Sequence, residues 1–261
     1  MRIATWNVNS IRSRIDRVEA WLARTDVDVL LVQETKARDE QFPRDRFRAL
    51  GYEVAHHGTN QWNGVAILSR VGLDDVQVGF DGDPGWGEPL VAEARSIGAT
   101  CNGIRLWSVY VPNGRALDDP HMVYKLDWLA RLRERATEWA ADGTPVALCG
   151  DWNIAPQDGD VWSMEYYLDK SHVSPPERAA FNAFLEAGFV DVVRPHTPGP
   201  GVYTYWDYQR LAFQKRRGMR IDFVLGSPTF AARVAGAAID REERKGAGAS
   251  DHAPVVVQLT D

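Results

Sequence analysis

The order of apolar segments along the chain most constrains its fold. Residues 3–8 and 27–32 have the apolar character of buried strands, and between them Ile11, Ile15, Val18 and Leu22 recur at helical spacing. This opening predicts a strand, a helix and a second strand. From Tyr52 through Val111 the helical period disappears, and β-type segments follow one another at 52–57, 64–69, 73–78, 90–97 and 104–111. We expect this middle block to be largely antiparallel.

Helices and strands alternate again after the middle block. A helix is predicted to begin at Asp118-Asp119-Pro120, because proline is tolerated in a first turn, and its apolar face carries Leu126, Leu129, Leu132, Ala136 and Trp139. A strand at 145–148 follows. Ser174-Pro175-Pro176-Glu177 has the form of a capping box and predicts a further helix. Closing strands are predicted at 220–225, 234–239 and 254–259.

These elements predict one architecture. No Ser/Pro-rich linker or low-complexity tract divides the chain, so residues 1–261 are predicted to form a single domain. The expected fold class is α/β, a four-layered sandwich of two packed mixed β-sheets flanked by helices. A Rossmann fold is not expected, because no Gly-x-Gly-x-x-Gly turn follows the first strand.

Composition limits the function classes. With 261 residues, 44% of them hydrophobic, the chain can bury a sizeable core. Its net charge of −6 argues against a passive nucleic-acid coat, although residues 210–220 are locally basic. The apolar runs are too short to cross a bilayer, so no membrane segment is expected. The chain opens without a signal-peptide pattern, and Cys101 and Cys149 lie in apolar surroundings, which predicts a reducing, cytoplasmic location.

Polar clusters follow several of the predicted strands. They are Trp6-Asn7-Val8-Asn9, Gln33-Glu34-Thr35-Lys36, Gly150-Asp151-Trp152-Asn153 and, about thirty residues after Asp222, Ser250-Asp251-His252. Because strand ends meet at one edge of a sheet, where sites are usually built, we expect these side chains to converge. Carboxylates, carboxamides and one imidazole together indicate a metal-dependent hydrolytic cleft.

Each cluster also has a structural interpretation. Glu34 is either a hard-cation ligand or an acceptor for Lys36 and backbone donors. Asn7 and Asn9, taken alone, are more typical of a turn or helix cap. The pair Asp151 and Asn153 is more specific, because an Asx-turn would not explain the other acidic clusters.

The imidazole and the aromatic residues have structural alternatives as well. A lone His252 is usually structural, yet Asp222 is placed to orient its ring. Tyr110, which precedes Asn113 at another strand end, is either a strand-end amphiphile or a site residue. The aromatic cluster 203–208 is either part of the core or a stacking surface for nucleic acid.

Taken in order, seven motifs resemble those of the exonuclease III family of apurinic/apyrimidinic endonucleases, within the endonuclease/exonuclease/phosphatase superfamily. The resemblance spans the whole chain, and the order and spacing of the motifs make it specific. The motifs are Trp6-Asn7-Val8-Asn9, Gln33-Glu34-Thr35-Lys36, Tyr110-Val111-Pro112-Asn113-Gly114, Gly150-Asp151-Trp152-Asn153, Tyr205-Trp206-Asp207-Tyr208, Arg220-Ile221-Asp222 and Ser250-Asp251-His252-Ala253-Pro254.

The resemblance implies a Mg²⁺-dependent phosphodiesterase, with Mn²⁺ able to substitute. It would cut duplex DNA 5′ to abasic sites, leave a 3′-hydroxyl, and have 3′→5′ exonuclease and 3′-end trimming activity. The expected partner is double-stranded DNA with abasic sites or blocked 3′ ends, bound by a monomer. A metal neutralises the charge that grows on the phosphate.

The resemblance also implies roles for individual residues. The metal would be held by Glu34, with Asn7 close by and Asp251 contributing to a metal position. Asp151, oriented by Asn153, would activate the attacking water or protonate the leaving oxygen. The scissile phosphate would be bound by His252, paired with Asp222, and by Tyr110 with Asn113. The DNA-binding residues would be Tyr205, Trp206, Met219, Arg216 and Arg217, the last two from the basic stretch 210–220, which would follow the phosphate backbone.

Two positions depart from the family pattern, and two other functions compete. Asn9 stands where an animal member has Asp, and Met219 replaces a bulky aromatic residue of some relatives in the abasic pocket. A non-catalytic nucleic-acid-binding regulator should have lost a metal or phosphate residue, and none is lost here. A phosphatase of phosphoinositides or sphingolipids would share the Asp-His and Gly-Asp-x-Asn elements but would lack the aromatic stretch beside a basic segment.

Overall fold

Two six-stranded β-sheets packed face to face form the centre of the protein. The structure is a computed structural model that describes residues 1–260. The first sheet has the order β11-β12-β1-β2-β4-β3. Its strands are β1 (Arg2–Asn7), β2 (Val29–Gln33), β3 (Glu53–His57), β4 (Val65–Ser69), β11 (Val234–Ile239) and β12 (Val255–Leu259). The second sheet has the order β5-β6-β7-β8-β10-β9. Its strands are β5 (Asp74–Val78), β6 (Ser96–Cys101), β7 (Ile104–Tyr110), β8 (Val146–Asp151), β9 (Val190–Asp191) and β10 (Asp222–Gly226).

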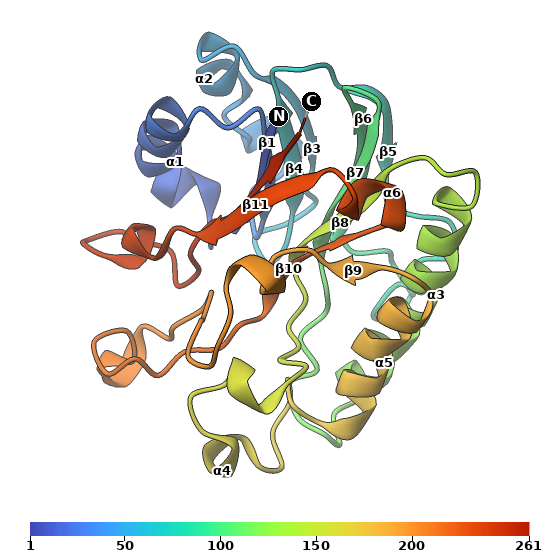
Figure 1. The fold of residues 1–261 in the computed structure, drawn as a ribbon, viewed down its shortest axis with the longest axis vertical. Helices are drawn as coiled ribbons and strands as arrows, with labels where there is room; N and C mark the ends of the chain where they lie inside the picture. The colour runs from blue at the N-terminus through green and yellow to red at the C-terminus, as the bar shows by residue number, and fades with distance from the viewer. Residues whose placement is uncertain (261) are drawn as a thin grey trace.

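Helices cover the outer face of each sheet (Figure 1). The first sheet is covered by α1 (Ile11–Thr25) and α2 (Arg44–Ala49), and the second by α3 (Pro120–Trp139) and α5 (Pro175–Glu186). The short helices α4 (Met164–Tyr167) and α6 (Pro228–Ala231) lie at opposite ends of the sandwich. Within residues 1–260, none of the helices has the length and apolarity that crossing a bilayer requires.

The alternation of side chains along a strand explains why the central strands are apolar throughout. In β2, Val29 and Leu31 belong to the core between the two sheets, whereas Leu30 and Val32 pack in the layer that α1 covers. A strand buried on both faces therefore has no polar face until it ends. The predicted four-layered sandwich is confirmed. The single domain predicted for residues 1–261 stays a prediction, which the shared core between the sheets supports.

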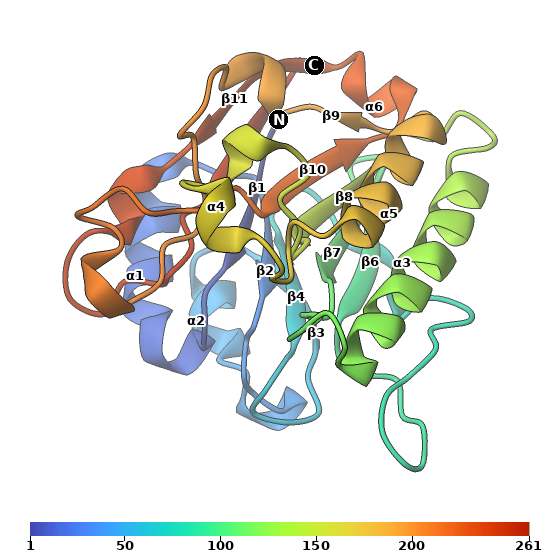
Figure 2. The same cartoon turned by 90° about the horizontal axis from the view of Figure 1, so that it is seen from below.

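The strand pairing brings the polar clusters to one edge. β1 and β2 are parallel with Asn7 opposite Gln33, and β7 and β8 are parallel with Tyr110 opposite Asp151. β10 runs antiparallel to β8, so its first residue, Asp222, also lies opposite Asp151. This edge lies at the bottom of Figure 1 and faces the reader in Figure 2.

Most of the predicted elements are present, and the middle block is antiparallel as expected, although its strands divide between the two sheets. The strand predicted at 90–97 is wrong, because β6 begins only at Ser96. Leu90 and Val91 are 73% and 59% exposed, so these apolar side chains do not mark a buried strand.

Candidate active site

The carboxamide of Asn7 connects two carboxylates at the shared strand edge. Its Nδ2 donates to Glu34 Oε1 at 2.8 Å and to Asp151 Oδ2 at 3.0 Å. Lys36 Nζ lies 2.9 Å from Glu34 Oε2. Burial opposes ionisation of Glu34, but Lys36 and Asn7 outweigh it and lower the pKa of this carboxyl. Glu34 therefore offers a charged carboxylate in a largely buried position.

The backbone at this edge is held in an unusual conformation. Asn9, Glu34 and Asn153 have φ values of 45°, 50° and 49°, in the left-handed region that non-glycine residues rarely adopt. Each follows the end of a different strand, β1, β2 or β8. Such strained positions persist when surrounding contacts hold them, and they cluster at functional sites.

His252 lies between two buried carboxylates. Its Nδ1 is 2.8 Å from Asp222 Oδ2, the contact that the sequence predicted, and its Nε2 is 3.8 Å from Asp151 Oδ2. Burial disfavours the imidazolium, but Asp222 and Asp151 outweigh it and raise the pKa of His252 to about 10. Burial, together with the charges of Asp222 and Glu34, raises the pKa of Asp151 to about 7, against the opposing effect of His252. The site thus holds a charged imidazole beside a carboxyl that exchanges its proton near neutrality.

Tyr110, Asn113 and Asn153 complete this side of the site. Burial and then the charge of Glu34 raise the pKa of Tyr110 well above its usual value, so its phenol stays protonated. Asn153 donates its backbone N–H to Asp151 Oδ1 at 2.9 Å, and its own Oδ1 lies 3.5 Å from Asn113 Nδ2. The predicted orientation of Asp151 by Asn153 is therefore present as a hydrogen bond.

The residues fit a hard divalent cation. Ligand atoms of Glu34, Asp151 and His252 lie within 4.8 Å of one another. Two of these groups are carboxylates, and Mg²⁺ is usually bound through one or two carboxylates while it keeps several waters. The third, the charged imidazole of His252, has no free nitrogen to coordinate a metal. Asp251, also predicted at a metal position, lies outside this group and instead accepts from Asn9 Nδ2 at 3.1 Å.

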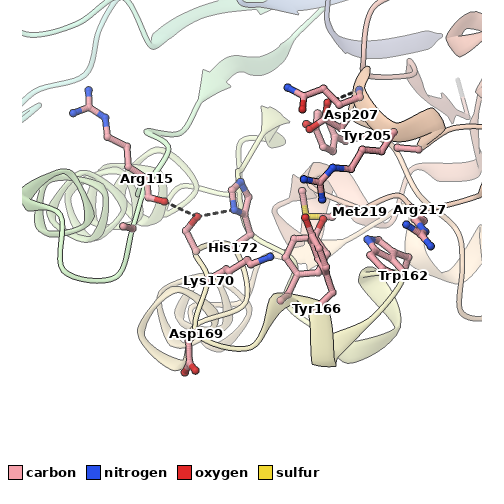
Figure 3. Close-up of a pocket in the computed structure, with 16 residues that line it drawn as sticks. Arg115, Trp162, Tyr166, Asp169, Lys170, His172, Tyr205, Asp207, Arg217 and Met219 are labelled. Atoms are coloured by element: carbon pink, nitrogen blue, oxygen red, sulfur yellow. Dashed lines mark hydrogen bonds between the residues drawn. The ribbon is translucent and has the colours of Figure 1, made fainter.

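A cavity of about 450 Å³ adjoins the site (Figure 3). Tyr205 and Met219, two of the residues predicted to bind DNA, line it, and the centre of the Tyr205 ring lies 5.0 Å from that of the His252 ring. The wall includes Trp162, which the Arg217 guanidinium covers at 4.7 Å. The lining residues come from two segments far apart in the sequence, 162–172 and 205–219, with Arg115 and Ala116 at one side.

Several predicted DNA-binding residues are placed differently. Trp206, expected among the DNA-binding residues, is 1% exposed, packs against Phe213 and Ala253, and does not line the cavity, so its side chain has no surface open to DNA. Arg220, at the end of the basic stretch, is 2% exposed and binds both Asp191 oxygens, at 2.8 and 2.9 Å. Arg216 is exposed and is not among the cavity-lining residues, whereas Arg217 lines it.

Sequence reasoning missed three residues around the site. His172 lines the cavity and its Nε2 lies 3.2 Å from Asn153 Oδ1. Lys125 and Glu177 form an ion pair behind it. The capping box at Ser174 identified Glu177 only as a helix cap, and Lys125 lies on the apolar face of α3, where helical spacing alone predicts a hydrophobic residue.

Comparisons with known proteins identify the family. The pattern of the Endonuclease/Exonuclease/phosphatase family matches residues 4–252. The chain belongs to this family. It is 31% identical to an exodeoxyribonuclease of Bacillus subtilis over 98% of each chain. An AP endonuclease of Archaeoglobus fulgidus is 36% identical with a TM-score of 0.92 over 99% of each chain. A 3′ phosphatase from Neisseria, solved with a product DNA hairpin, is 37% identical with a TM-score of 0.94 over 100% of this chain and 99% of its own. The predicted resemblance to the exonuclease III branch is confirmed.

Proposed function

We propose that the protein is a Mg²⁺-dependent DNA-repair phosphodiesterase. It cleaves duplex DNA 5′ to abasic sites, leaves a 3′-hydroxyl, and trims 3′ ends. The observation that carries this proposal is the convergence of Glu34, Asp151 and His252, with side-chain atoms within 4.8 Å of one another, beside a cavity whose lining includes Arg115, Lys170, Arg210 and Arg217. Membership of a family whose relatives are named exodeoxyribonuclease and AP endonuclease supports it.

The side chains divide the work of phosphodiester hydrolysis. Asp151, whose pKa is about 7, takes a proton from the attacking water or returns one to the leaving oxygen. The imidazolium of His252 donates from Nε2 to a phosphate oxygen while Asp222 holds Nδ1. The protonated Tyr110 and the amide of Asn113 offer further donors on the same side. These donors stabilise the charge that develops in the transition state.

The cation would be held by Glu34 with Asn7 and Asp151 nearby. When bound, it neutralises charge on the phosphate and lowers the pKa of a coordinated water. Mg²⁺ suits the carboxylate oxygens, and Mn²⁺ is expected to substitute. A role for Asp251 in a metal position stays a prediction, as do the monomeric state and the cytoplasmic location.

End-labelled duplexes test the reaction. One duplex carries a single internal tetrahydrofuran abasic analogue, and the matched duplex is intact. Each is incubated with Mg²⁺ or with EDTA. We expect a cut 5′ to the analogue that leaves a 3′-hydroxyl, only with Mg²⁺. Equal cleavage with EDTA would contradict the metal requirement, and loss of terminal phosphate from inositol phosphates without DNA cleavage would favour a phosphatase.

Glu34→Gln tests the metal ligand. Removing a charged oxygen ligand should shift the Mg²⁺ titration of activity to higher concentration, with partial recovery at high Mg²⁺ and little change in DNA affinity. Asp39→Asn is the matched control, because Asp39 also follows β2 but binds His56. An unchanged metal titration in Glu34→Gln rejects the ligand role.

A second candidate for the main activity is the processing of 3′ ends, without efficient cleavage at internal abasic sites. The cavity wall favours it, because Trp162, Tyr166 and Tyr167 are aromatic and Lys170 Nζ lies 3.3 Å from the Tyr166 ring centre (Figure 3). Aromatic side chains stack on nucleobases, which an abasic sugar lacks. Duplexes with a 3′-phosphate or a 3′-terminal mismatch, compared with the internal analogue, decide which substrate is cleaved faster.

A further inference from the structure

An ion pair with no exposed surface lies directly behind the site. Lys125 on α3 and Glu177 on α5 are both 0% exposed, and Lys125 Nζ lies 2.5 Å from Glu177 Oε1. Desolvating two charges costs several kcal/mol for each ion, and apolar replacements of similar volume are often as stable. Stability alone therefore explains this pair poorly, and its remaining hydrogen bonds indicate what it does.

Two of these hydrogen bonds reach segments that build the site, and a third caps α5. Lys125 Nζ donates to the backbone carbonyl of Asn153 at 2.6 Å. Glu177 Oε1 accepts the backbone N–H of His172 at 3.0 Å, and its Oε2 accepts the Ser174 hydroxyl at 2.6 Å. The pair thus connects the loop after β8 with the segment that forms one wall of the cavity.

Asn153 shows why this connection affects chemistry. Its φ of 49° lies in the left-handed region, which asparagine adopts more readily than most residues with a side chain, and hydrogen bonds from its backbone and side chain fix it there. Its N–H fixes Asp151 Oδ1 at 2.9 Å, and its Nδ2 donates to Val111 O at 3.0 Å. Lys125 is the side-chain donor to its carbonyl. If that donor is removed, a buried carbonyl is left unpaired and the left-handed conformation is less well supported.

We propose that the Lys125–Glu177 pair is a positioning device that holds Asn153, and through it Asp151, in the geometry required for phosphodiester cleavage. It also fixes the cavity wall at His172 relative to that loop. This inference rests on the proposed function. The pair touches no substrate and acts through Asn153 and His172.

Single and double substitutions separate positioning from stability. Lys125→Met leaves Glu177 buried without its partner, so both stability and activity should fall. Lys125→Met combined with Glu177→Leu removes both charges, so part of the stability should return, although the His172 N–H and the Ser174 hydroxyl lose their acceptor. The Asn153 carbonyl still has no donor in the double variant. We therefore expect its single-turnover rate on the abasic duplex to stay roughly 10- to 100-fold below the unmodified protein, with DNA affinity changed less than about threefold.

Leu132→Ala provides the matched control for stability. Leu132 lies on the same helix, is fully buried in the core between α3 and the second sheet, and is not part of the ion-pair network. This variant should be less stable yet cleave at the normal rate below its unfolding temperature. A double variant that regains stability and also cleaves at the normal rate overturns the proposal.

A second measurement does not depend on cleavage. Hydrogen exchange of the backbone amides at 151–155 and 171–174 should accelerate in the double variant, because both segments lose the ion pair that connects them. In Leu132→Ala, the exchange rates of these amides compared with those of core amides should not change. If the unmodified protein cuts no DNA but exchange still accelerates in the double variant, the proposed function fails and the positioning role of the Lys125–Glu177 pair is still supported. Unchanged exchange in both segments rejects the positioning role of the ion pair.

Discussion

His252 gains its charge from its neighbours and not from exposure to water. Burial alone would make the imidazole neutral, yet Asp222 at 2.8 Å and Asp151 at 3.8 Å raise its pKa to about 10. The pKa of Asp151 is also raised, to about 7, so this carboxyl can accept a proton near neutrality, whereas His252 keeps its proton. Two titratable groups in contact thus have separate tasks.

Asp222→Asn should change the pH dependence of cleavage. Without the Asp222 charge, burial lowers the pKa of His252, so the imidazole loses its proton as pH rises through the neutral range. The unmodified protein keeps that proton until about pH 10. The single-turnover rate should therefore fall by roughly 10²- to 10⁴-fold at about pH 8.5 and by less at about pH 6. An equal loss at both pH values would show that Asp222 acts by another route.

The same pKa value gives the sign of a stability change. A group whose pKa is raised on folding stabilises the fold below its unfolded pKa, which is 6.5 for this imidazole, and the contribution is lost as pH rises towards about 10. Urea unfolding of the unmodified protein between pH 6.5 and about 10 should show this loss. In Asp222→Asn the dependence over that interval should be weaker.

Sequence reasoning reached the charged residues of the site but not all of their supports. Asp151 ends β8, whereas Asp222 and His252 lie at or before the starts of the antiparallel strands β10 and β12, so the strand topology brings all three to one edge. Trp206 belongs to one of the same motifs, yet it points into the core. The direction of a side chain in an irregular segment depends on packing that no local pattern records.

Strands and helices show the same division. The capping box at Ser174 predicted α5 because its hydrogen bonds are local, and both are present. The prediction at 90–97 failed because Leu90 and Val91 are apolar but exposed. Gly150 lies inside β8, which continues through Asp151, and its lack of a side chain permits a close approach to the neighbouring strand.

Gly150→Ala should disrupt the pairing that aligns Tyr110 with Asp151. A Cβ at this position would lie 1.8 Å from the carbonyl oxygen of Val109 on the neighbouring strand β7, so close that only a backbone shift can relieve the clash. We expect a decrease of about 1–3 kcal/mol or more in the free energy of unfolding, measured by urea denaturation. Gly236→Ala in β11 is the control, since an added Cβ there meets no atom within 4 Å. Equal stability of the two variants would mean that the backbones of β7 and β8 can shift apart at position 150 without a measurable loss of stability.

Charge is unevenly distributed over the molecule as a whole. The net charge is −6, yet the cavity beside the site is lined by four cationic residues, Arg115, Lys170, Arg210 and Arg217, against two acidic ones, Asp169 and Asp207. The acidic residues Glu34, Asp151 and Asp222 are instead gathered in the adjoining site. A protein with a negative net charge can therefore present positive charges to DNA beside its site. The local distribution of charge affects binding more than the net charge does.

Neutralising Lys215, Arg216 and Arg217 to Gln tests that surface. Arg217 lines the cavity, and Lys215 and Arg216 are exposed next to it in the sequence, so we expect all three to bind DNA phosphates. Affinity for abasic and intact duplexes should fall alike. The slope of log affinity against log salt should decrease by about one unit for each DNA phosphate that the variant no longer neutralises.

The matched control removes three positive charges elsewhere, by changing Arg131, Arg133 and Arg135 to Gln. These residues lie on α3, away from the cavity lining, and two of them pair with Glu134 and Glu138 on the same helix. If only net charge matters, both triple variants will weaken binding equally. If the cavity-side residues bind the DNA backbone, the control keeps the salt slope of the unmodified protein. Because counterions are released only where phosphates are neutralised, the difference in slope between the two variants measures how many phosphates residues 215–217 neutralise.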